Sequence, residues 1–329
     1  MNPFAYQRAT DVDHAVAAVS TSTSSKFLAG GTNLIDLMKD GVEKPAMLVD
    51  INRLELASIE ALPNGGLRLG ALARNSDTAN HPLVRRYYPL LSQAILSGAS
   101  PQLRNLATNG GNLLQRTRCP YFMDPAFPNC NKRAPGSGCG AREGFNRIHA
   151  ILGAGEQCIA VHPSDMCVAL AALEATVRVR GPRGERLIPF TEFHRLPGTT
   201  PQLDTNLKPD ELILSIDLPP SAYAEHCHYL KVRDRASYEF ALVSVAAAVE
   251  LDGDVVRSAR VALGGVAHKP WRDPAAEKML TGGKCSPAAF RSAADKLLAG
   301  AQPYSGNRFK VEMARRAVVR ALSVATGAA

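Results

Sequence analysis

The last third of the chain places its strands before its helices. Residues 240–251 form an apolar run, the turn Asp252-Gly253-Asp254 follows, and residues 255–263 return with alternating apolar positions. Two such runs joined by a tight turn predict an antiparallel pair of strands. Helical spacing then recurs at 273–280, 286–299 and 310–325. Strands followed by helices predict an α+β domain, which we expect to begin at about residue 224.

Shorter elements alternate through the first two thirds of the chain. Their spacing predicts helices at 11–19, 34–39, 83–97 and 166–175, and strands at 26–29, 46–50, 66–72, 176–180 and 211–218. Because 329 residues exceed one ordinary hydrophobic core, we expect two or three domains. We divide the chain into a first domain at 1–223, with parts at about 1–55 and 56–223, and a second domain at 224–329.

The first strand–helix junction carries a pair of glycines. It reads Phe27-Leu28-Ala29-Gly30-Gly31-Thr32-Asn33-Leu34. Glycine lets the backbone approach a ligand closely, and free N–H groups at a helix start attract an anion. Phosphate binding and an ordinary strand–helix turn both fit this segment. It lacks the GxGxxG fingerprint, so it does not predict a Rossmann fold.

A second pair of glycines lies in Thr108-Asn109-Gly110-Gly111-Asn112, where Asn-Gly is also a common hairpin turn. A pyrophosphate needs backbone donors from several loops, so two such loops in one chain favour a dinucleotide. Further along, Ser164-Asp165 follows His162-Pro163. The acid can hold a ribose or ribityl hydroxyl, or the two residues can cap the helix that follows.

Four of the seven cysteines lie in an insertion at about 114–159 that is rich in proline and glycine. Cys119, Cys130, Cys139 and Cys158 are separated by 10, 8 and 18 residues. This is neither the bacterial ferredoxin spacing nor a CxxC zinc ribbon. Four thiolates on a long loop suit a [4Fe–4S] cluster, while structural zinc and simple burial are the alternatives. An odd cysteine count without a signal peptide argues against a disulfide framework.

The other cysteines and the histidines show no metal-binding pattern. Cys167 is expected in a helix core, and Cys285 is incidental. Cys227 alternates along a strand with His226 and His228, so it faces away from both. No neighbouring ligand types accompany His81, His149, His194 and His268, which we expect on the surface or in the core. The chain has no GxSxG, HExxH or Walker loop, so we expect no catalytic residues for an organic substrate.

The charge and apolar content of the chain indicate which kinds of partner it can bind. The formal net charge is +8, but Lys and Arg never run longer than two. We therefore expect a solvated surface or a docking face for acidic proteins rather than a nucleic-acid site. Apolar stretches such as 240–249 are too short to insert in a membrane. The N-terminus shows no export signal of its own, so we expect a periplasmic location only if a signal-bearing partner carries the chain, and a cytoplasmic one otherwise.

Five motifs, taken in chain order, resemble one family. They are AGGTN, TNGGN, HPSD, ELILSIDLP and YLKVRDRASYEFALVSVAAAVEL. Each is short, but their order and spacing cover nearly the whole chain. Together they are similar to the FAD-binding medium subunit of the xanthine dehydrogenase and carbon monoxide dehydrogenase (molybdenum hydroxylase) family. The cysteine insertion resembles that of the periplasmic aldehyde oxidoreductase branch.

The resemblance implies an α+β fold. A two-subdomain FAD-binding domain of the PCMH/VAO type would precede a C-terminal domain of antiparallel strands and helices, of the CO dehydrogenase flavoprotein type. The family's cofactor-binding positions match Lys26, Phe27, Leu28, Ala29, Gly30, Gly31, Thr32, Asn33, Leu34, Thr108, Gly111, Asn112, Asp165, Ile213 and Lys231. Lys231 would lie close to the flavin and stabilise its reduced, anionic form; a plain surface lysine is the alternative.

The same resemblance implies metals and partners. Cys119, Cys130, Cys139 and Cys158 would bind a [4Fe–4S] cluster, which most relatives lack. A molybdenum-cofactor large subunit would oxidise an aldehyde or aromatic heterocycle. Electrons would pass through a [2Fe–2S] small subunit to FAD in this chain, and on to an external acceptor. The rival hypotheses are a stand-alone flavin reductase of the same fold and a zinc-stabilised assembly module without redox activity.

Overall fold

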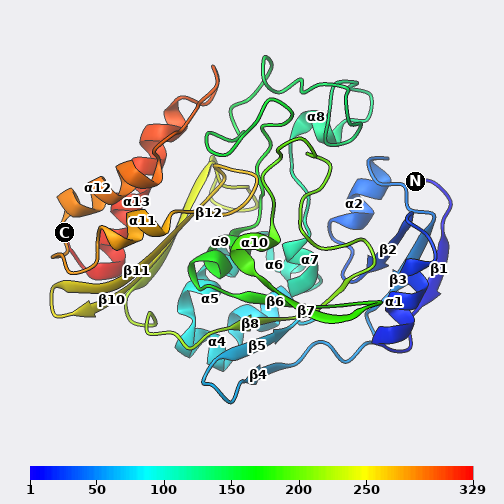
Figure 1. Cartoon of the computed structure of the whole chain (residues 1–329), viewed down its shortest axis with the longest axis horizontal. Coiled ribbons are helices and arrows are strands. Elements are labelled where there is room, and N and C mark those ends of the chain that lie inside the picture. The colour runs from blue at the N-terminus through cyan, green and yellow to red at the C-terminus, as the bar shows by residue number, and fades with distance from the viewer. Residues whose placement is uncertain (329) are drawn as a thin grey trace.

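Three sheets, each with its own helices, follow one another along the molecule. The computed structural model describes residues 1–328, and Figure 1 shows a small N-terminal sheet, a central sheet and a C-terminal sheet from one end to the other. Irregular loops lie along one edge of this row (Figure 1). The expected α+β class is confirmed.

The N-terminal sheet is parallel, in the order β1-β3-β2. Its elements are β1 (Ala5–Arg8), α1 (Val12–Ser20), β2 (Ser25–Leu28), α2 (Leu34–Lys39) and β3 (Met47–Asp50). The Asp11 carboxylate caps α1 by accepting a hydrogen bond from the His14 N–H at 2.7 Å. Val16 and Val19 of α1 pack in one core with Val49 of β3. This packing holds the end of β2, where the first glycine pair begins.

The central sheet is antiparallel, in the order β4-β5-β8-β6-β7. Its strands are β4 (Ile59–Ala61), β5 (Leu67–Gly70), β6 (Thr176–Gly181), β7 (Gly184–Pro189) and β8 (Leu212–Leu218). β5 precedes the cysteine segment and β6 follows it, and both strands pair with β8. The cysteine segment therefore leaves one continuous sheet and returns to it. Its ends are therefore fixed by the sheet while its middle is free to take an irregular path.

The described chain forms eight short helices between β5 and β8. They are α3 (Asn75–Asn80), α4 (Pro82–Tyr87), α5 (Pro89–Ser97), α6 (Pro101–Arg104), α7 (Asn109–Leu113), α8 (Pro120–Met123), α9 (Asp165–Ala172) and α10 (Phe190–Phe193). The single helix expected at 83–97 is wrong, because Tyr88 leaves the helical conformation (ψ 51°) before Pro89 starts α5. Proline disfavours a helical residue before it and cannot donate to the preceding turn.

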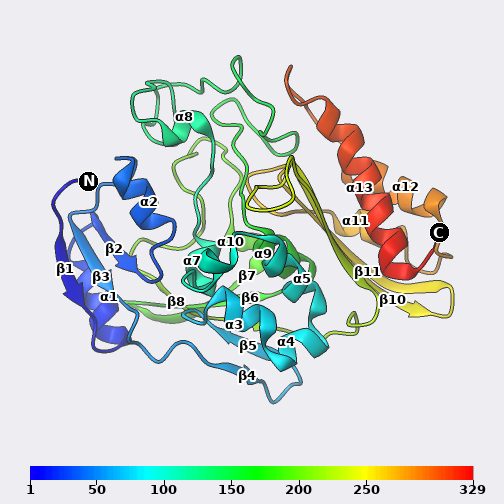
Figure 2. The ribbon, with the colours of Figure 1, turned by 180° about the vertical axis from the view of Figure 1, so that it is seen from behind.

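The C-terminal sheet is antiparallel, in the order β12-β11-β10-β9. Its elements are β9 (Cys227–Val232), β10 (Val243–Asp252), β11 (Val255–Gly264), β12 (Trp271–Arg272), α11 (Pro274–Lys278), α12 (Pro287–Leu297) and α13 (Phe309–Thr326). Figure 2 shows α12 and α13 on the outer side of this sheet. Val245 and Val249 of β10 belong to the core that includes these helices, whereas Ala246 and Ala248 belong to the core around α9. Both faces are covered, which explains the unbroken apolar run in β10.

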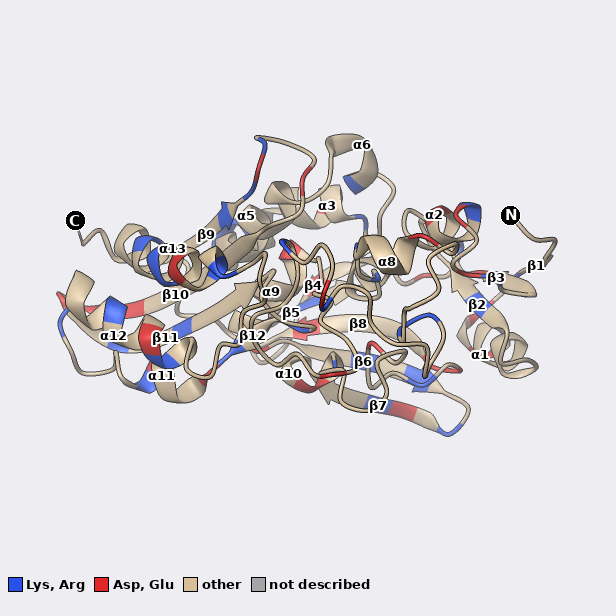
Figure 3. Ribbon diagram, turned by 90° about the horizontal axis from the view of Figure 1, so that it is seen from above, with Lys and Arg blue, Asp and Glu red and all other residues tan. Residues whose placement is uncertain are grey.

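The cysteine segment between α7 and α9 contains one short helix, α8, and otherwise turns and bends. Basic and acidic residues are mixed over the ribbon without a large field of one sign (Figure 3). No helix within residues 1–328 is long and apolar enough to cross a membrane.

Candidate flavin and cysteine sites

The first glycine pair lies against the backbone of Leu106, which shortly precedes the second pair. A Cβ on Gly30 would meet the Leu106 carbonyl oxygen at 2.1 Å, so no larger residue fits there. Gly31 has φ +71°, and a Cβ on it would also meet the Ile35 side chain at 2.7 Å. The turn from β2 to α2 therefore requires glycine for two separate reasons, close packing at one position and conformation at the next.

The turn between β2 and α2 leaves three backbone N–H donors without a protein partner in the part of the chain that the structure describes. Within residues 1–328, the N–H groups of Gly31, Thr32 and Asn33 donate to no protein oxygen. The Asn33 side chain faces elsewhere, because its Oδ1 accepts a hydrogen bond from the Arg116 N–H at 3.0 Å. Successive free N–H groups in a glycine turn form a concave site that suits an anion.

The second glycine pair forms the short helix α7 rather than a hairpin. Thr108 caps it, and its Oγ1 accepts a hydrogen bond from the Gly111 N–H at 3.3 Å. Asn112 is fully engaged by neighbours: its Nδ2 donates to Asn75 at 2.8 Å, and its Oδ1 accepts from Ser164 at 2.5 Å. Asn112 therefore joins α7 to the start of α9.

One cavity of about 360 Å³ opens between the two glycine loops. Twelve of the fifteen expected cofactor residues line it: Lys26, Phe27, Leu28, Ala29, Gly30, Gly31, Thr32, Asn33, Leu34, Thr108, Gly111 and Ile213. Asn112, Asp165 and Lys231 are outside its wall. A cavity of this size with an apolar lining and a few convergent donors is typical of a cofactor site.

A charged wall of this cavity was missed by the sequence analysis. Arg116 pairs with Glu43 at 2.6 Å and with Asp204 at 2.8 Å, and all three line the cavity. Lys132 from the cysteine segment reaches the same Asp204 at 2.5 Å. Burial opposes ionisation of Asp204, but the charges of Lys132 and Arg116 outweigh it and hold its pKa well below the ordinary range. No pattern in sequence links these residues, which are up to 161 positions apart (204 − 43).

Asp165 and Lys231, which do not line the large cavity, form a buried ion pair. Their side chains are 6% and 4% exposed, and the Nζ–Oδ2 distance is 2.8 Å. The Tyr229 hydroxyl donates to the other oxygen of Asp165 at 2.7 Å. Burial, followed by the charge of Asp165, raises the Tyr229 pKa well above its ordinary value, so this hydroxyl stays protonated. The same pair resolves the choice between a surface and a buried Lys231 in favour of burial.

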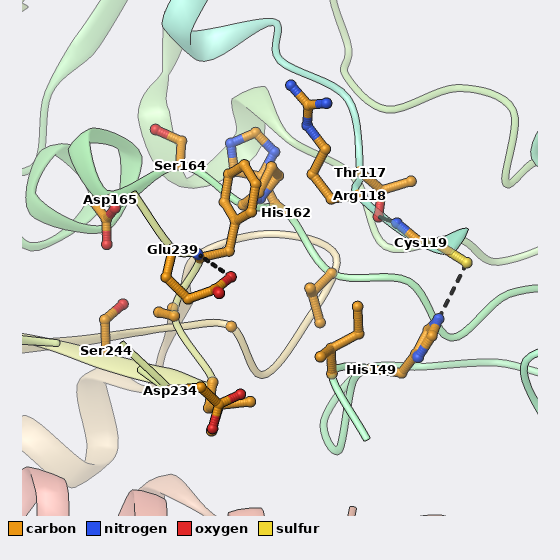
Figure 4. A pocket seen from close by; sticks show the side chains of 18 residues that line it. Thr117, Arg118, Cys119, His149, His162, Ser164, Asp165, Asp234, Glu239 and Ser244 are labelled. Atoms are coloured by element: carbon orange, nitrogen blue, oxygen red, sulfur yellow. Dashed lines mark hydrogen bonds between the residues drawn. The ribbon is translucent and has the colours of Figure 1, made fainter. Parts of the chain in front are cut away.

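A second, smaller cavity of about 80 Å³ is lined at one end by Asp165. Figure 4 shows Asp165 and Ser244 on one side of it and the Cys119–His149 contact on the other. His149 Nε2 lies 3.1 Å from the Cys119 sulfur. The cavity therefore extends from the expected flavin residues to the cysteine segment.

The four cysteines of the segment line one cavity, as their predicted grouping requires. A β-bridge pairs Cys130 with Cys139, supported by a hydrogen bond from the Asn131 N–H to the Gly138 carbonyl at 2.7 Å. All four are free thiols. The loop thus gathers thiols that are up to 39 positions apart (158 − 119) into one place.

The protonation of these thiols differs with their surroundings. Burial raises the pKa of Cys119 to about 12. Cys139 accepts a hydrogen bond from Cys158, which lowers the Cys139 pKa to about 6 and raises that of Cys158. One thiolate is therefore available in this pair at neutral pH, and the remaining protons would leave on binding a metal.

His149 and His194 are buried, which is one of their two expected placements, but each lies beside a cysteine. His149 contacts a cysteine of the segment, and His194 lies in a buried group with His162 and Cys167. Burial lowers the pKa of His149 to about 4, so this ring is neutral. Sequence distance hid these groupings, because each histidine is 27 or more positions from its partner cysteine (194 − 167 = 27; 149 − 119 = 30). Cys227 lies at the start of β9, outside any such group within the described chain.

Two family models match the chain, and curated relatives extend over nearly its whole length. Residues 2–221 match the family described as FAD binding domain in molybdopterin dehydrogenase, and residues 228–325 match the CO dehydrogenase flavoprotein C-terminal domain. The chain is 52% identical over 326 residues to the aldehyde oxidoreductase FAD-binding subunit PaoB of Escherichia coli strain K12, covering 99% of both chains. It is 29% identical to the glyceraldehyde dehydrogenase medium chain of Sulfolobus acidocaldarius, covering 98% of this chain and 96% of the relative.

A solved structure has the same fold. It is carbon monoxide dehydrogenase from Hydrogenophaga pseudoflava, to which this chain aligns with a TM-score of 0.77 and 28% identity, covering 99% of each chain. The similarity extends through all three sheets rather than one domain.

Proposed function

This chain belongs to the FAD-binding medium subunits of the molybdopterin dehydrogenases, and from that premise we propose that it is the flavin subunit of a molybdenum-dependent aldehyde oxidoreductase. The observation that carries the proposal is the cavity of about 360 Å³ between two glycine loops, one of which offers three unbonded N–H groups. The aldehyde as substrate class rests on the 52% identical relative, whose name states that activity. FAD supplies the hydride and single-electron chemistry when bound.

The residues fit FAD in separate roles. Gly31, Thr32 and Asn33 hold the pyrophosphate through their N–H groups, since these donors have no other partner. Gly30 lets its loop approach the backbone at Leu106, just before the second glycine loop, and Ile213 contributes an apolar wall. We assign the same cofactor-binding role to the remaining residues expected from the sequence.

Asp165 and Lys231 act at the flavin end of the same cofactor. Asn112 links the second glycine loop to Ser164, the neighbour of Asp165, so the ion pair lies directly beyond that loop. If FAD binds there, the ammonium of Lys231 would stabilise negative charge on the flavin and raise its reduction potential. Asp165 holds the ammonium in place at 2.8 Å, so it is a positioning residue.

We propose that Cys119, Cys130, Cys139 and Cys158 bind a [4Fe–4S] cluster. All four line one cavity, and the Cys139–Cys158 pair already carries a thiolate at neutral pH. A zinc ion bound at about 2.3 Å would hold its sulfurs about 3.8 Å apart. Among residues 1–328, no three of these sulfurs lie within 4.8 Å of one another. The wider spacing favours a cluster, which is larger than a single ion.

The partners follow from the role of a medium subunit. In the complex we propose, a molybdenum-cofactor large subunit would oxidise the aldehyde, a [2Fe–2S] small subunit would carry the electrons to FAD in this chain, and an external acceptor would receive them. The names of the relatives, which call them subunits and medium chains, support a hetero-oligomer. The compartment is then set by whichever partner carries a signal.

We propose that the units of function correspond to residues 1–223 and 224–329. The N-terminal unit would hold FAD between its parts at about 1–55 and 56–223, with the cluster on the insertion at about 114–159. The two matched models, at 2–221 and 228–325, support this division.

Purification of the native complex tests the proposal. We expect one FAD per chain, and four irons per chain in addition to those of the small subunit. We also expect a molybdenum-bearing partner and aldehyde-dependent bleaching of the flavin band. Flavin without the extra iron removes the cluster but keeps the flavin subunit. Flavin without any molybdenum partner favours a stand-alone reductase. A colourless, zinc-containing chain that takes up no FAD favours the assembly module.

A pair of cysteine variants tests the cluster separately. Cys139→Ser removes a thiol of the cavity, whereas Cys227→Ser removes one outside it. We expect Cys139→Ser to lose the extra iron while Cys227→Ser retains it, with FAD retained in both. Equal iron in the two variants contradicts the ligand assignment.

A further inference from the structure

Three metal-binding side chains meet in the interior, outside both the flavin and the cysteine cavities. His162, Cys167 and His194 each offer one donor atom, and these atoms all lie within 4.8 Å of one another. They come from three segments: the loop before α9, α9 itself, and the end of α10. The Cys167 and His194 residues are 0% and 3% exposed, so water does not compete freely for them.

His194 is oriented for binding by its second nitrogen. Its Nε2 lies 2.9 Å from the Leu113 carbonyl oxygen, which can only accept, so Nε2 carries the proton. Nδ1 then has a free lone pair, and it is buried without a hydrogen-bond partner. A histidine that donates one N–H to a backbone carbonyl and presents the other nitrogen is the usual arrangement of a metal ligand.

His162 presents a second unpartnered nitrogen. Its ring centroid lies 4.1 Å from that of His194, and its Nε2 is buried without a partner. Two adjacent buried nitrogens without partners are unfavourable unless a bound group satisfies both. His162 also lines the cavity of about 80 Å³, so an ion has a path to the group (Figure 4).

Cys167 lies in the first turn of α9. Ser164 caps this helix by accepting a hydrogen bond from the Cys167 N–H at 3.1 Å. Burial raises the pKa of the Cys167 thiol to about 12, so a bound metal ion would displace its proton. The thiol is fully buried and forms no disulfide. A buried thiol cannot reach a redox partner. The position of Cys167 beside two neutral imidazoles is better explained if its sulfur binds a metal ion.

We propose that His162, Cys167 and His194 bind one zinc ion. Two imidazoles and one thiolate form a ligand set that zinc accepts, with water as a fourth ligand. The site is independent of the four-cysteine cavity and of the flavin cavity.

The ion would join segments that shape both cofactor cavities. The loop with His162 follows directly from Cys158, and α9 begins with Asp165. His194 forms a β-bridge with Thr205, the neighbour of Asp204 in the wall of the large cavity. Zinc therefore ties the end of the cysteine segment to the core of the FAD-binding domain.

Zinc content and zinc K-edge absorption of the purified native complex test this inference. We expect one zinc per chain, with one sulfur at about 2.3 Å and nitrogens at about 2.0 Å in the fitted shell. Iron and molybdenum absorb at other edges and do not interfere. A shell of four sulfurs would place the zinc on the cysteine segment instead. That result, or zinc-free protein that binds no added zinc, overturns the inference.

Matched variants locate the ion. His194→Gln keeps a side-chain N–H for the Leu113 carbonyl but removes the Nδ1 ligand, and Cys167→Ala removes the sulfur. We expect each to weaken zinc binding by more than the roughly 10- to 100-fold that loss of an outer hydrogen-bond partner causes. The controls His268→Gln, at a buried histidine outside the group, and Cys227→Ala should retain zinc. Flavin absorbance reports folding in every variant, and full zinc in a folded His194→Gln chain contradicts the assignment.

Discussion

The substitution Asp204→Asn removes a carboxylate that is shared by two cations. Lys132 Nζ lies 2.5 Å from Asp204 and 2.7 Å from the Pro201 carbonyl, with only 2% of its side chain exposed. Removing one partner of a buried ion pair costs about 3–5 kcal/mol, because the other charge is left uncompensated. Asp204 is 30% exposed and asparagine keeps one acceptor, so we expect the lower end, about 3 kcal/mol.

Thermal unfolding of the FAD-loaded chain measures this loss. A change of 1 kcal/mol shifts Tm by about 2–4 °C in domains of 150–250 residues, so we expect about 6–12 °C. Asp295→Asn is the control, because Arg315 and Asp295 lie 2.6 Å apart but 30% and 52% exposed. Exposed pairs contribute at most about 1 kcal/mol. Equal shifts for the two variants would refute the reasoning from burial.

The same pair sets a pH dependence with a defined sign. The folded pKa of Asp204 is held below its ordinary value, so its contribution is complete above the unfolded pKa of about 3.9. It is lost as the pH falls below that value. The Tm difference between the wild-type chain and Asp204→Asn should therefore be constant from about pH 5 to 8 and shrink below about pH 4. A difference that grows on acidification contradicts this assignment.

Three further substitutions address separate parts of the chain. Gly30→Ala places a Cβ 2.1 Å from the Leu106 carbonyl oxygen, so we expect FAD loss on dialysis, measured by flavin absorbance, while retention would show that the loops can separate. Lys231→Met should lower the flavin reduction potential in a spectroelectrochemical titration, because the reduced ring loses a buried cation; an unchanged potential contradicts its flavin role. Phe290→Ala empties a fully buried position on the inner face of α12 and should cost about 3–5 kcal/mol in unfolding experiments, with FAD content unchanged in the folded protein.

Local patterns predicted the elements of the fold well where periodicity was strong. The helices α1, α2 and α13 and the strands β10 and β11 lie within a few residues of their predicted positions. Elements without a clear period were missed, including β7 and β12, because their stability comes from the sheets that they extend. The predicted helix at 83–97 was wrong because the apolar spacing continues across Pro89, whereas the helical backbone is interrupted at Tyr88.

The amino-acid sequence by itself determined the two glycine loops, the four loop cysteines and the α+β order, because each depends on residue type and local spacing. It also carried the family resemblance, through the order of five motifs. Only the tertiary structure decided that Arg116, Asp204 and Lys132 form one network, and that His162, Cys167 and His194 share one buried point. Those groupings depend on which loops the sheets bring together, and that contact information is non-local. The sequence identifies the charged and metal-binding side chains, and the tertiary structure determines which of them lie together.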